Sequence, residues 1–304
     1  MVLISVVIAT KNRPKDLKNC LKAILRNKFK NFEVVVVDQS KNKESEKIIK
    51  SFRSKRIIYK HQRKEGKSYA LNYGIKISKG KLIAFTDDDC IVSKDWLKNI
   101  FSSFKRNKYI YGVFGNTLPY RKQFHKDESC PSRIVVKKYS MFKIPVVHWE
   151  KIGNGNNMAF RKEVFEMLGY FKEWLSTGTY SYSGEDSEFV NRLLYRGFSV
   201  SHDPSVLVYH NSWLTYKEYR LKKLHYLCGM MASYGYLGLK GVDIGKKVVA
   251  RHIYFTKENL KGDIIKFIKI KNFSLQEFIY HLKELFYLSK GLFIAFIHRR
   301  ENHI

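Results

Sequence analysis

Short apolar runs rich in β-branched residues alternate with amphipathic stretches along the first part of the chain. Such runs are typical of strands buried on both faces, whereas apolar positions three and four apart indicate helices that cover a sheet. The pattern predicts strands at residues 2–10, 32–38, 57–59 and 82–85, and helices at residues 14–25, 44–52 and 68–77. Because short connections join these elements, we expect a parallel sheet with right-handed crossovers.

The pattern continues less regularly up to residue 213. It predicts helices at residues 94–104, 161–167 and 185–195, and extended segments at residues 109–116, 153–161 and 199–210. Residues 118–150 have no clear period, so we expect an excursion over one edge of the sheet. The segment 171–186 is rich in Gly, Ser, Thr and aromatic residues, which suits a loop that closes on a ligand.

From residue 214 onward the chain consists of long helical stretches rich in Tyr, Phe, Leu and Lys. We therefore divide it into an α/β unit, residues 1–213, and a helical extension, residues 214–304. No apolar run in the extension reaches the ~20 residues that a membrane-spanning helix needs. The longest, residues 285–297, fits equally a helix that lies in a membrane interface and a helix that packs on the rest of the protein.

The composition excludes disorder but leaves the partners open. Hydrophobic residues make up 44% of the 304 residues and aromatic residues 15%, which is enough for a sizeable core. The net charge of +30 suits nucleic acid, anionic lipid or an acidic substrate, yet residues 214–304 carry only +10 of it, so the excess is not a dedicated basic tail. Four widely spaced cysteines indicate reduced, cytoplasmic thiols rather than a disulfide framework, and the N-terminus predicts a strand rather than a signal peptide.

Polar residues follow three of the predicted strands at the point where each strand ends. Thr10, Asp38 and Asp87 hold such positions, and the carboxyl ends of parallel strands form a ligand-binding crevice. The last of these strands is followed by three carboxylates in a row, Asp87, Asp88 and Asp89, which repel one another unless a positive charge is bound. Asp87 and Asp89 point to the same side of an extended chain and can share a divalent cation that also takes phosphate oxygens. A solvated acidic turn is the alternative for such a run on its own.

Seven short motifs give the chain a resemblance to glycosyltransferase family 2, the inverting nucleotide-sugar transferases with an A-type fold. The resemblance covers residues 4–213 and rests on SVVIATKNRP, VVVVDQS, GKSYALNYGI, AFTDDDC, GNGNNMAFR, SGEDSEFVNRLLYRGF and DPSVLVYH, in this order. Each motif alone is weak, whereas seven in the right order are specific. The resemblance implies a Rossmann-like α/β domain over residues 1–213, with a mostly parallel sheet flanked by helices.

The resemblance also implies roles for the residues at the strand ends. Asp87 and Asp89 match the D-x-D positions that hold a divalent metal, Mn²⁺ or Mg²⁺, which neutralises the departing diphosphate. His210 matches a histidine that joins the metal in many relatives, although a structural role is the alternative for a lone histidine. Asp88 is assigned to the donor sugar. The residues implied to bind the nucleotide are Thr10, Asn12, Asp38, Lys67 and Asp87.

Inversion by direct displacement requires a base that accepts the proton of the acceptor hydroxyl. Asp186 matches the family's base, and Glu185 precedes it at the predicted start of a helix. The helix N-terminus lowers the pKa of Asp186, whereas the adjacent Glu185 raises it. The alternative is that both carboxylates only cap the helix.

The chain departs from the usual pattern of the family at three points. DQS at residues 38–40 replaces D-D-G-S or D-N-G-S, Leu71 replaces a frequent Arg, and Lys172 replaces the Asp of a Phe-Asp-Glu segment. The first two departures put the identity of the donor in doubt. The third concerns the loop expected to meet the acceptor.

The sequence therefore predicts a metal-dependent glycosyltransferase that moves a sugar from a nucleotide sugar, first of all a UDP-sugar, to a hydroxyl of a surface polysaccharide or lipid-linked glycan. Because such acceptors lie at the cytoplasmic face of a membrane, we expect a cytoplasmic protein that is peripheral at the inner face of the cell membrane, with an anionic surface as partner. A nucleotidyltransferase is one alternative, but the segment KNRP at residues 11–14 lacks the glycines of its phosphate loop. A basic nucleic-acid-binding protein is another, but we find no recognition module and expect no nucleic acid partner.

Overall fold

The computed structural model describes residues 2–123, 125–146, 151–269 and 272–301. The first strands of the chain form the predicted parallel sheet. The strands lie in the order β3 (Ile57–His61), β2 (Phe32–Asp38), β1 (Ile4–Thr10) and β4 (Leu82–Thr86), each parallel to its neighbour. The connecting helices are α1 (Pro14–Leu25), α2 (Glu44–Ser51) and α3 (Lys67–Ile77). Pro14 begins α1, where its missing N–H removes no helical hydrogen bond.

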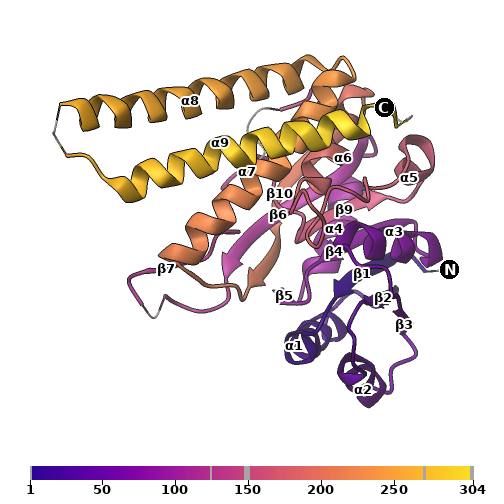
Figure 1. Cartoon of the computed structure of the whole chain (residues 1–304). Helices are drawn as coiled ribbons and strands as arrows, with labels where there is room; N and C mark the ends of the chain where they lie inside the picture. Colours follow the sequence, from indigo (N-terminus) through magenta and orange to yellow (C-terminus); the bar gives the residue numbers. More distant parts are fainter. Residues whose placement is uncertain (1, 124, 147–150, 270–271, 302–304) are drawn as a thin grey trace.

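Helices cover both faces of this sheet (Figure 1). Val6 of β1 belongs to the hydrophobic cluster on the α1 face, whereas the next residue, Val7, belongs to the cluster on the α3 face. Gly74 of α3 lies directly over β1, because a Cβ atom at this position would overlap the side chain of Val7. The alternating apolar residues of the strands therefore build two cores, one on each side of the sheet.

Beyond β4 the sheet continues with strands of mixed direction. The strand β9 (Asn157–Arg161) runs antiparallel between β4 and β6 (Ile110–Pro119), and β10 (Ser199–His210) lies parallel to β6. The helices α4 (Trp96–Arg106), α5 (Glu163–Leu168) and α6 (Glu185–Tyr195) accompany these strands, as predicted. The α/β fold and the order of its main elements are therefore confirmed.

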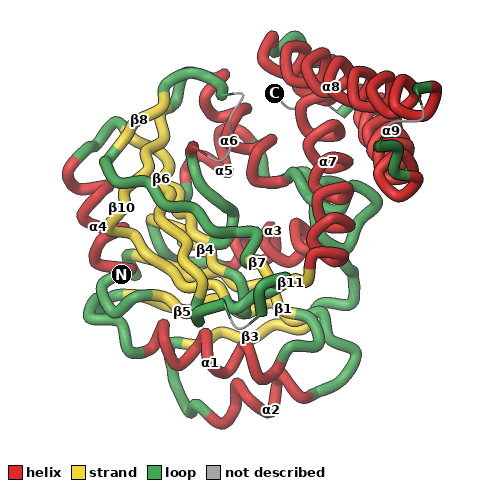
Figure 2. Tube along the Cα trace, turned by 90° about the vertical axis from the view of Figure 1, so that its left-hand side faces the viewer, coloured by secondary structure: helices red, strands yellow, loops and turns green. Residues whose placement is uncertain are grey.

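Four short strands were not predicted, because segments of two or three residues carry no readable period. The strand β5 (Cys90–Val92) pairs with β10 at the edge of the sheet, and β8 (Ser140–Phe142) also pairs with β10. A separate pair consists of β7 (Glu128–Ser129) and β11 (Leu214–Thr215). The described part of the expected excursion, residues 118–150, thus adds a strand to the main sheet and also reaches the start of the helical extension (Figure 2).

The extension consists of α7 (Tyr216–Leu239), α8 (Asp243–Ile268) and α9 (Leu275–Ile297), followed by the 3-10 turn η2 (His298–Arg300). A capping box of Thr215 and Glu218 begins α7. Helix α9 packs on α7 so closely that a Cβ atom at Gly291 would overlap the backbone oxygen of Cys228. The packing interpretation of residues 285–297 is therefore confirmed for one face of α9. Among the described helices, none combines the length and the apolar character that crossing a membrane requires.

Candidate active site

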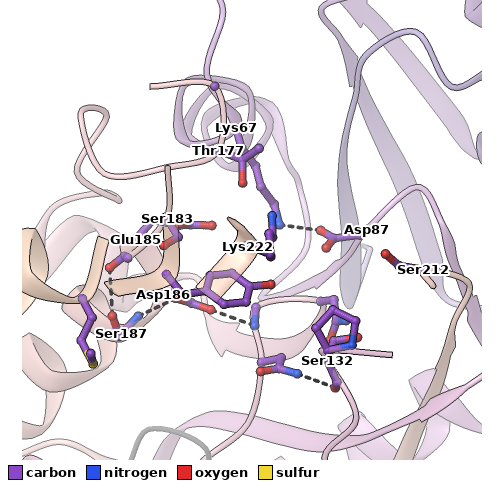
Figure 3. Close-up of a pocket in the computed structure, with 18 of the residues that line it drawn as sticks. Lys67, Asp87, Ser132, Thr177, Ser183, Glu185, Asp186, Ser187, Ser212 and Lys222 are labelled. Carbon is purple, nitrogen blue, oxygen red and sulfur yellow. Dashed lines mark hydrogen bonds and ion pairs between the residues drawn. The ribbon is translucent and has the colours of Figure 1, made fainter. Parts of the chain in front are cut away.

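A cavity of about 940 Å³ opens at the carboxyl ends of β1, β2 and β4 and extends to α7 (Figure 3). Most of the residues predicted for the site line it together, although they come from five different elements or loops. They are Thr10, Lys67, Asp87, Asp88, Asp89, Glu185, Asp186 and His210. Two further predicted residues, Asn12 and Asp38, do not line the cavity.

Lys67 lies at the start of α3, and the backbone around it fixes its position. Gly66 has a φ of 121°, in the region that favours glycine, and the N–H of Lys67 donates to the carbonyl of Thr177 at 3.0 Å. The Nζ atom of Lys67 lies 2.6 Å from Oδ1 of Asp87. Burial lowers the pKa of Lys67, but the charges of Asp87 and Glu185 raise it by more. Lys67 is therefore a permanent cation between two groups of carboxylates.

Asp88 is the most buried of the three strand-end carboxylates. It is 5% exposed, and its Oδ2 accepts a hydrogen bond of 2.7 Å from Oγ1 of Thr10. Burial raises the pKa of Asp88 to about 6, against the opposing effects of Thr10 and Arg13. The hydroxyl of Thr10, predicted to contact the nucleotide, is thus engaged with Asp88.

Asp89 and His210 form an ion pair at the edge of the cavity. Nε2 of His210 lies 3.1 Å from Oδ1 of Asp89, and Ser132 hydrogen-bonds to Nδ1 of the same imidazole. Burial lowers the pKa of His210, yet Asp89 raises it to about 10. Burial correspondingly raises the pKa of Asp89, and the hydrogen bond and charge of His210 lower it to about 2.

The surroundings of this pair fit a divalent cation. Asp89, Cys90 and His210 offer ligand atoms within 4.8 Å of one another. Oδ1 of Asp89 is buried and, apart from the ion pair with His210, makes no hydrogen bond to a described residue. A carboxylate oxygen suits Mn²⁺ or Mg²⁺, and an imidazole nitrogen is a common ligand beside it. Asp87, predicted as the second carboxylate ligand, is instead paired with Lys67.

Asp38 and Asn12 lie differently from what we predicted for nucleotide-binding residues. Asp38 is fully buried, and its carboxylate accepts hydrogen bonds from the N–H of Ser40 (2.8 Å) and the hydroxyl of Tyr59 (3.0 Å). Its oxygens are thus used within the protein, and the neighbouring Gln39 lines the cavity in its place. Asn12 is exposed and donates its N–H to Ser40 at 2.7 Å, outside the cavity wall.

Glu185 and Asp186 begin α6 and face the strand-end carboxylates across the cavity (Figure 3). The capping position belongs to Gly184, and Oδ2 of Asp186 reaches another loop, where it accepts a hydrogen bond of 3.0 Å from the N–H of Gly155. Burial raises the pKa of both carboxylates, that of Glu185 to about 7, while the charge of Lys67 opposes the rise. A carboxylate with a raised pKa suits the acceptance of a proton near neutral pH.

Two of the three departures from the family pattern lie away from this cavity. Leu71 is 2% exposed and packs in the core on the α3 face. Lys172 is buried with its Nζ atom 3.4 Å from Glu301, a carboxylate to which Trp174 also donates at 3.0 Å. Glu301, directly after η2, therefore holds the start of the segment 171–186. Gln39 is the departure that lines the cavity.

Our sequence reasoning missed the contribution of α7 to the cavity. Lys222 and Tyr226, four residues apart and hence on one face of the helix, line it from α7. The helix is seated against the loop before α6, since a Cβ atom at Gly229 would overlap Ser183. A glycine among bulky residues was the signal that could have indicated this close approach.

Comparisons with known sequences agree on one family. The sequence model described as glycosyl transferase family 2 matches residues 5–169, which include Lys67 and Asp87 but not Asp186 or His210. An uncharacterized glycosyltransferase of Methanocaldococcus jannaschii is 30% identical over 194 residues, 59% of this chain and 63% of that protein. The glycosyltransferase GlyG of Streptococcus pneumoniae is 32% identical over 121 residues, 39% of this chain and 40% of that protein. The chain thus spans less than two thirds of the length of these relatives.

Solved structures agree on the fold. A structure of residues 1–349 of TarS from S. aureus superimposes with a TM-score of 0.64 at 16% identity, over 96% of this chain and 81% of that one. The mannosyltransferase PcManGT from Pyrobaculum calidifontis, in complex with GDP-Man and Mn²⁺, superimposes with a TM-score of 0.58 at 14% identity, over 97% and 86%. At these identities the likeness concerns the fold alone, and it extends over both the α/β unit and the helical extension.

Proposed function

Because this chain belongs to glycosyl transferase family 2, we propose that it transfers a sugar from a nucleotide-sugar donor to a hydroxyl group, with inversion at the anomeric carbon. This proposal takes precedence over nucleotidyl transfer and nucleic acid binding, because the family match covers the strand-end carboxylates themselves. The α/β unit of residues 1–213 would hold the chemistry, and the helical extension would complete its cavity.

One observation carries the proposal: two groups of carboxylates face each other across a single cavity, with Lys67 between them. Asp87 to Asp89 lie at the end of β4, where an anionic leaving group would need a cation. Asp186 lies opposite at the start of α6, held by a backbone N–H and raised in pKa by burial. A base on one side and a leaving-group site on the other is the arrangement that an in-line displacement requires.

The chain's own residues would divide the work as follows. The acceptor oxygen attacks the anomeric carbon while Asp186 accepts its proton, and the bond from that carbon to the diphosphate breaks on the opposite side. Glu185, the buried neighbour of Asp186, keeps the proton affinity of the pair high. Lys67 stabilises the diphosphate beside Asp87, and Asp88 contacts the donor sugar. Thr10 orients Asp88 through a hydrogen bond. Gln39, which lines the cavity, would face the base of the nucleotide in place of the buried Asp38.

We further propose that the transfer depends on Mn²⁺ or Mg²⁺ held by Asp89 and His210. The cation would neutralise negative charge on the departing diphosphate. The fit of these ligands and the Mn²⁺ in the PcManGT complex both support this proposal. Asp87 would join the ligand set only if Lys67 moved to the diphosphate. The bound UDP-GlcNAc of one TarS structure supports a UDP-sugar, whereas PcManGT with GDP-Man supports a GDP-sugar as the alternative.

The acceptor that we propose is a hydroxyl of a surface polysaccharide or lipid-linked glycan at the cytoplasmic face of the membrane. A relative named as a minor teichoic acid biosynthesis protein of Bacillus subtilis supports a cell-envelope polymer, although the match covers 12% of that protein. An apolar stripe on α9 supports contact with a membrane surface. Leu282, Phe286, Phe293 and Ile297 recur at helical spacing on its outer face and are each between 44% and 63% exposed.

A panel of nucleotide sugars tests the proposed function. We expect one UDP- or GDP-sugar, with Mn²⁺ or Mg²⁺, to raise the melting temperature and to be hydrolysed slowly without acceptor. EDTA should abolish both effects. The absence of any stabilisation and any hydrolysis across the panel would contradict the proposal.

A further inference from the structure

Lys222 of α7 is one of five Lys and Arg side chains that line the cavity; the others are Lys11, Arg13, Lys67 and Lys223. In Figure 3 its side chain enters the cavity near Lys67 and Asp87. Neither composition nor family motif pointed to it, because it lies in the helical extension, outside residues 5–169. It is the extension, therefore, that brings this charge to the ends of the strands.

Lys222 differs from Lys11, Arg13 and Lys67, which each form an ion pair, in having no anionic partner among the residues that the structure describes. Arg13 lies 2.9 Å from Asp89, and Lys67 lies 2.6 Å from Asp87. The Nζ atom of Lys222 lies 5.1 Å from the centre of the Tyr226 ring. Tyr226 is one helical turn further along α7, and its ring contacts the ammonium group of Lys222.

The charges around Lys222 favour the binding of an anion. Burial lowers its pKa, and the nearby cations Lys67 and Arg13 lower it further, while Asp87 and Glu185 raise it. Lys67 and Arg13 are already paired with carboxylates, whereas no carboxylate of a described residue lies within ion-pair distance of Lys222. A partly buried ammonium group in this state gains from a bound anion with oxygen acceptors.

The position of Lys222 is fixed before any ligand arrives. Leu224 is 3% exposed, and Oγ of Ser233 lies 3.2 Å from Oγ of Ser187 on α6. Asn191 of α6 also donates to the hydroxyl of Tyr234 at 3.1 Å. Contacts along several turns thus hold α7 on α6. Because Lys222 is carried by this packed helix, no loop has to close to bring it to the cavity.

We propose that Lys222 is a diphosphate-binding residue of the donor site. This inference rests on the proposed function. The Nζ atom donates hydrogen bonds to the phosphate oxygens of the nucleoside diphosphate, opposite to the side held by Asp89 and His210. When the bond between the anomeric carbon and the phosphate oxygen breaks, the electron pair stays on that oxygen, next to Lys222. The new bond forms to the acceptor oxygen, whose proton passes to Asp186.

Calorimetric titrations of the full chain in Mn²⁺ test this role with UDP, GDP, pyrophosphate and uridine as probes. Lys222→Ala should weaken the binding of pyrophosphate and of the tighter nucleoside diphosphate by roughly tenfold to a hundredfold, because a charge-assisted hydrogen bond is lost. Uridine, which has no phosphate, should bind unchanged. Lys222→Arg should retain most of the affinity, and Lys217→Ala, an exposed lysine on the same helix and outside the cavity, should retain all of it.

The outcomes separate this inference from the proposed function. If the wild type binds a nucleoside diphosphate and Lys222→Ala binds it equally well, Lys222 is not a diphosphate ligand and only this inference is wrong. Equal binding combined with a loss of transfer would also overturn it, and would assign the lysine to an anionic group of the acceptor. If the wild type binds neither nucleoside diphosphate nor pyrophosphate, both proposals are wrong. Melting curves identify any variant that fails to fold.

Discussion

The Nζ atom of Lys67 lies 2.6 Å from Oδ1 of Asp87, so a cation from the first turn of α3 meets the end of β4. The same charge lowers the pKa of Asp186 and Glu185 on the opposite side of the cavity, against the effect of burial. One lysine therefore acts electrostatically on both the proposed leaving-group side and the proposed base.

Asp186→Asn should abolish transfer and leave binding intact. The amide keeps the shape of the side chain but cannot accept the acceptor's proton, so we expect kcat to fall by about 10² to 10⁴. Titration with UDP in the presence of Mn²⁺ should give an unchanged affinity. Retained turnover would show that Asp186 is not the base. Glu163→Gln, an exposed carboxylate in the first turn of α5, is the matched control and should have no effect.

The pH dependence of transfer should report the pKa of this base. Burial raises the pKa of Asp186 above the ordinary value of an aspartate, and a base works only when deprotonated. The rate should therefore fall as the pH is lowered through this raised pKa. Lys67→Met removes the charge that opposes the rise, so the acid limb of the kcat profile should move to higher pH.

Lys67→Arg keeps the charge and serves as the control for this shift. Its acid limb should coincide with that of the wild type, whatever its effect on the affinity for the donor. If the limb of Lys67→Met does not move, the group that titrates is not under the influence of Lys67, and Asp186 would lose its assignment.

Metal binding should release a proton from His210. Asp89 raises the pKa of this imidazole to about 10, so it is protonated at pH 7.5 without metal, and it must lose the proton to become a ligand. Calorimetry of Mn²⁺ binding in two buffers with different ionisation enthalpies should give a release of about one proton. His210→Ala should release none and bind Mn²⁺ more weakly. An equal release from the wild type and His210→Ala would contradict the assignment of His210.

The sequence predicted the elements whose signal is local. The apolar runs of β1, β2 and β4, Pro14 at the start of α1 and the carboxylates at the start of α6 all depend on neighbours in sequence. For this reason their boundaries agree with the structure to within about two residues. The crevice at the strand ends also followed, because strand direction and connection length fix it.

What the sequence did not reveal depends on contacts between distant residues. Asp38 ends β2 as predicted, but Tyr59 of β3 and the N–H of Ser40 turn its carboxylate into the protein. The role of α7 was missed for the same reason, because the face that meets the cavity is decided by the packing of Gly229 on Ser183. Neither contact produces a periodic pattern in the sequence.

Gly229→Ala should weaken the packing of α7 on Ser183 and reduce transfer. The added methyl group would overlap the backbone oxygen of Ser183, so the helix and its cavity-lining residues must shift. Overpacking of this kind costs about 1 to 3 kcal/mol of the free energy of unfolding. Thermal melts and donor KM report the two effects. Gly262→Ala on α8, where the methyl group meets nothing within 4 Å, is the control and should stabilise by up to about 1 kcal/mol.

The apolar stripe of α9 should bind anionic membranes. Phe286 and Phe293 are each 63% exposed on the face of α9 that points away from α7, in a chain with a net charge of +30. The double substitution Phe286→Ser, Phe293→Ser should reduce flotation with phosphatidylglycerol vesicles by roughly tenfold or more, because both rings leave the interface. Wild type and variant should not differ with neutral phosphatidylcholine vesicles. Ile144→Ser, at a residue 73% exposed on the α/β part, is the control for loss of an exposed apolar side chain. Recovery of the wild type in the unbound fraction with anionic vesicles would refute the proposed membrane contact, and the transfer activity in solution would be unaffected by that result.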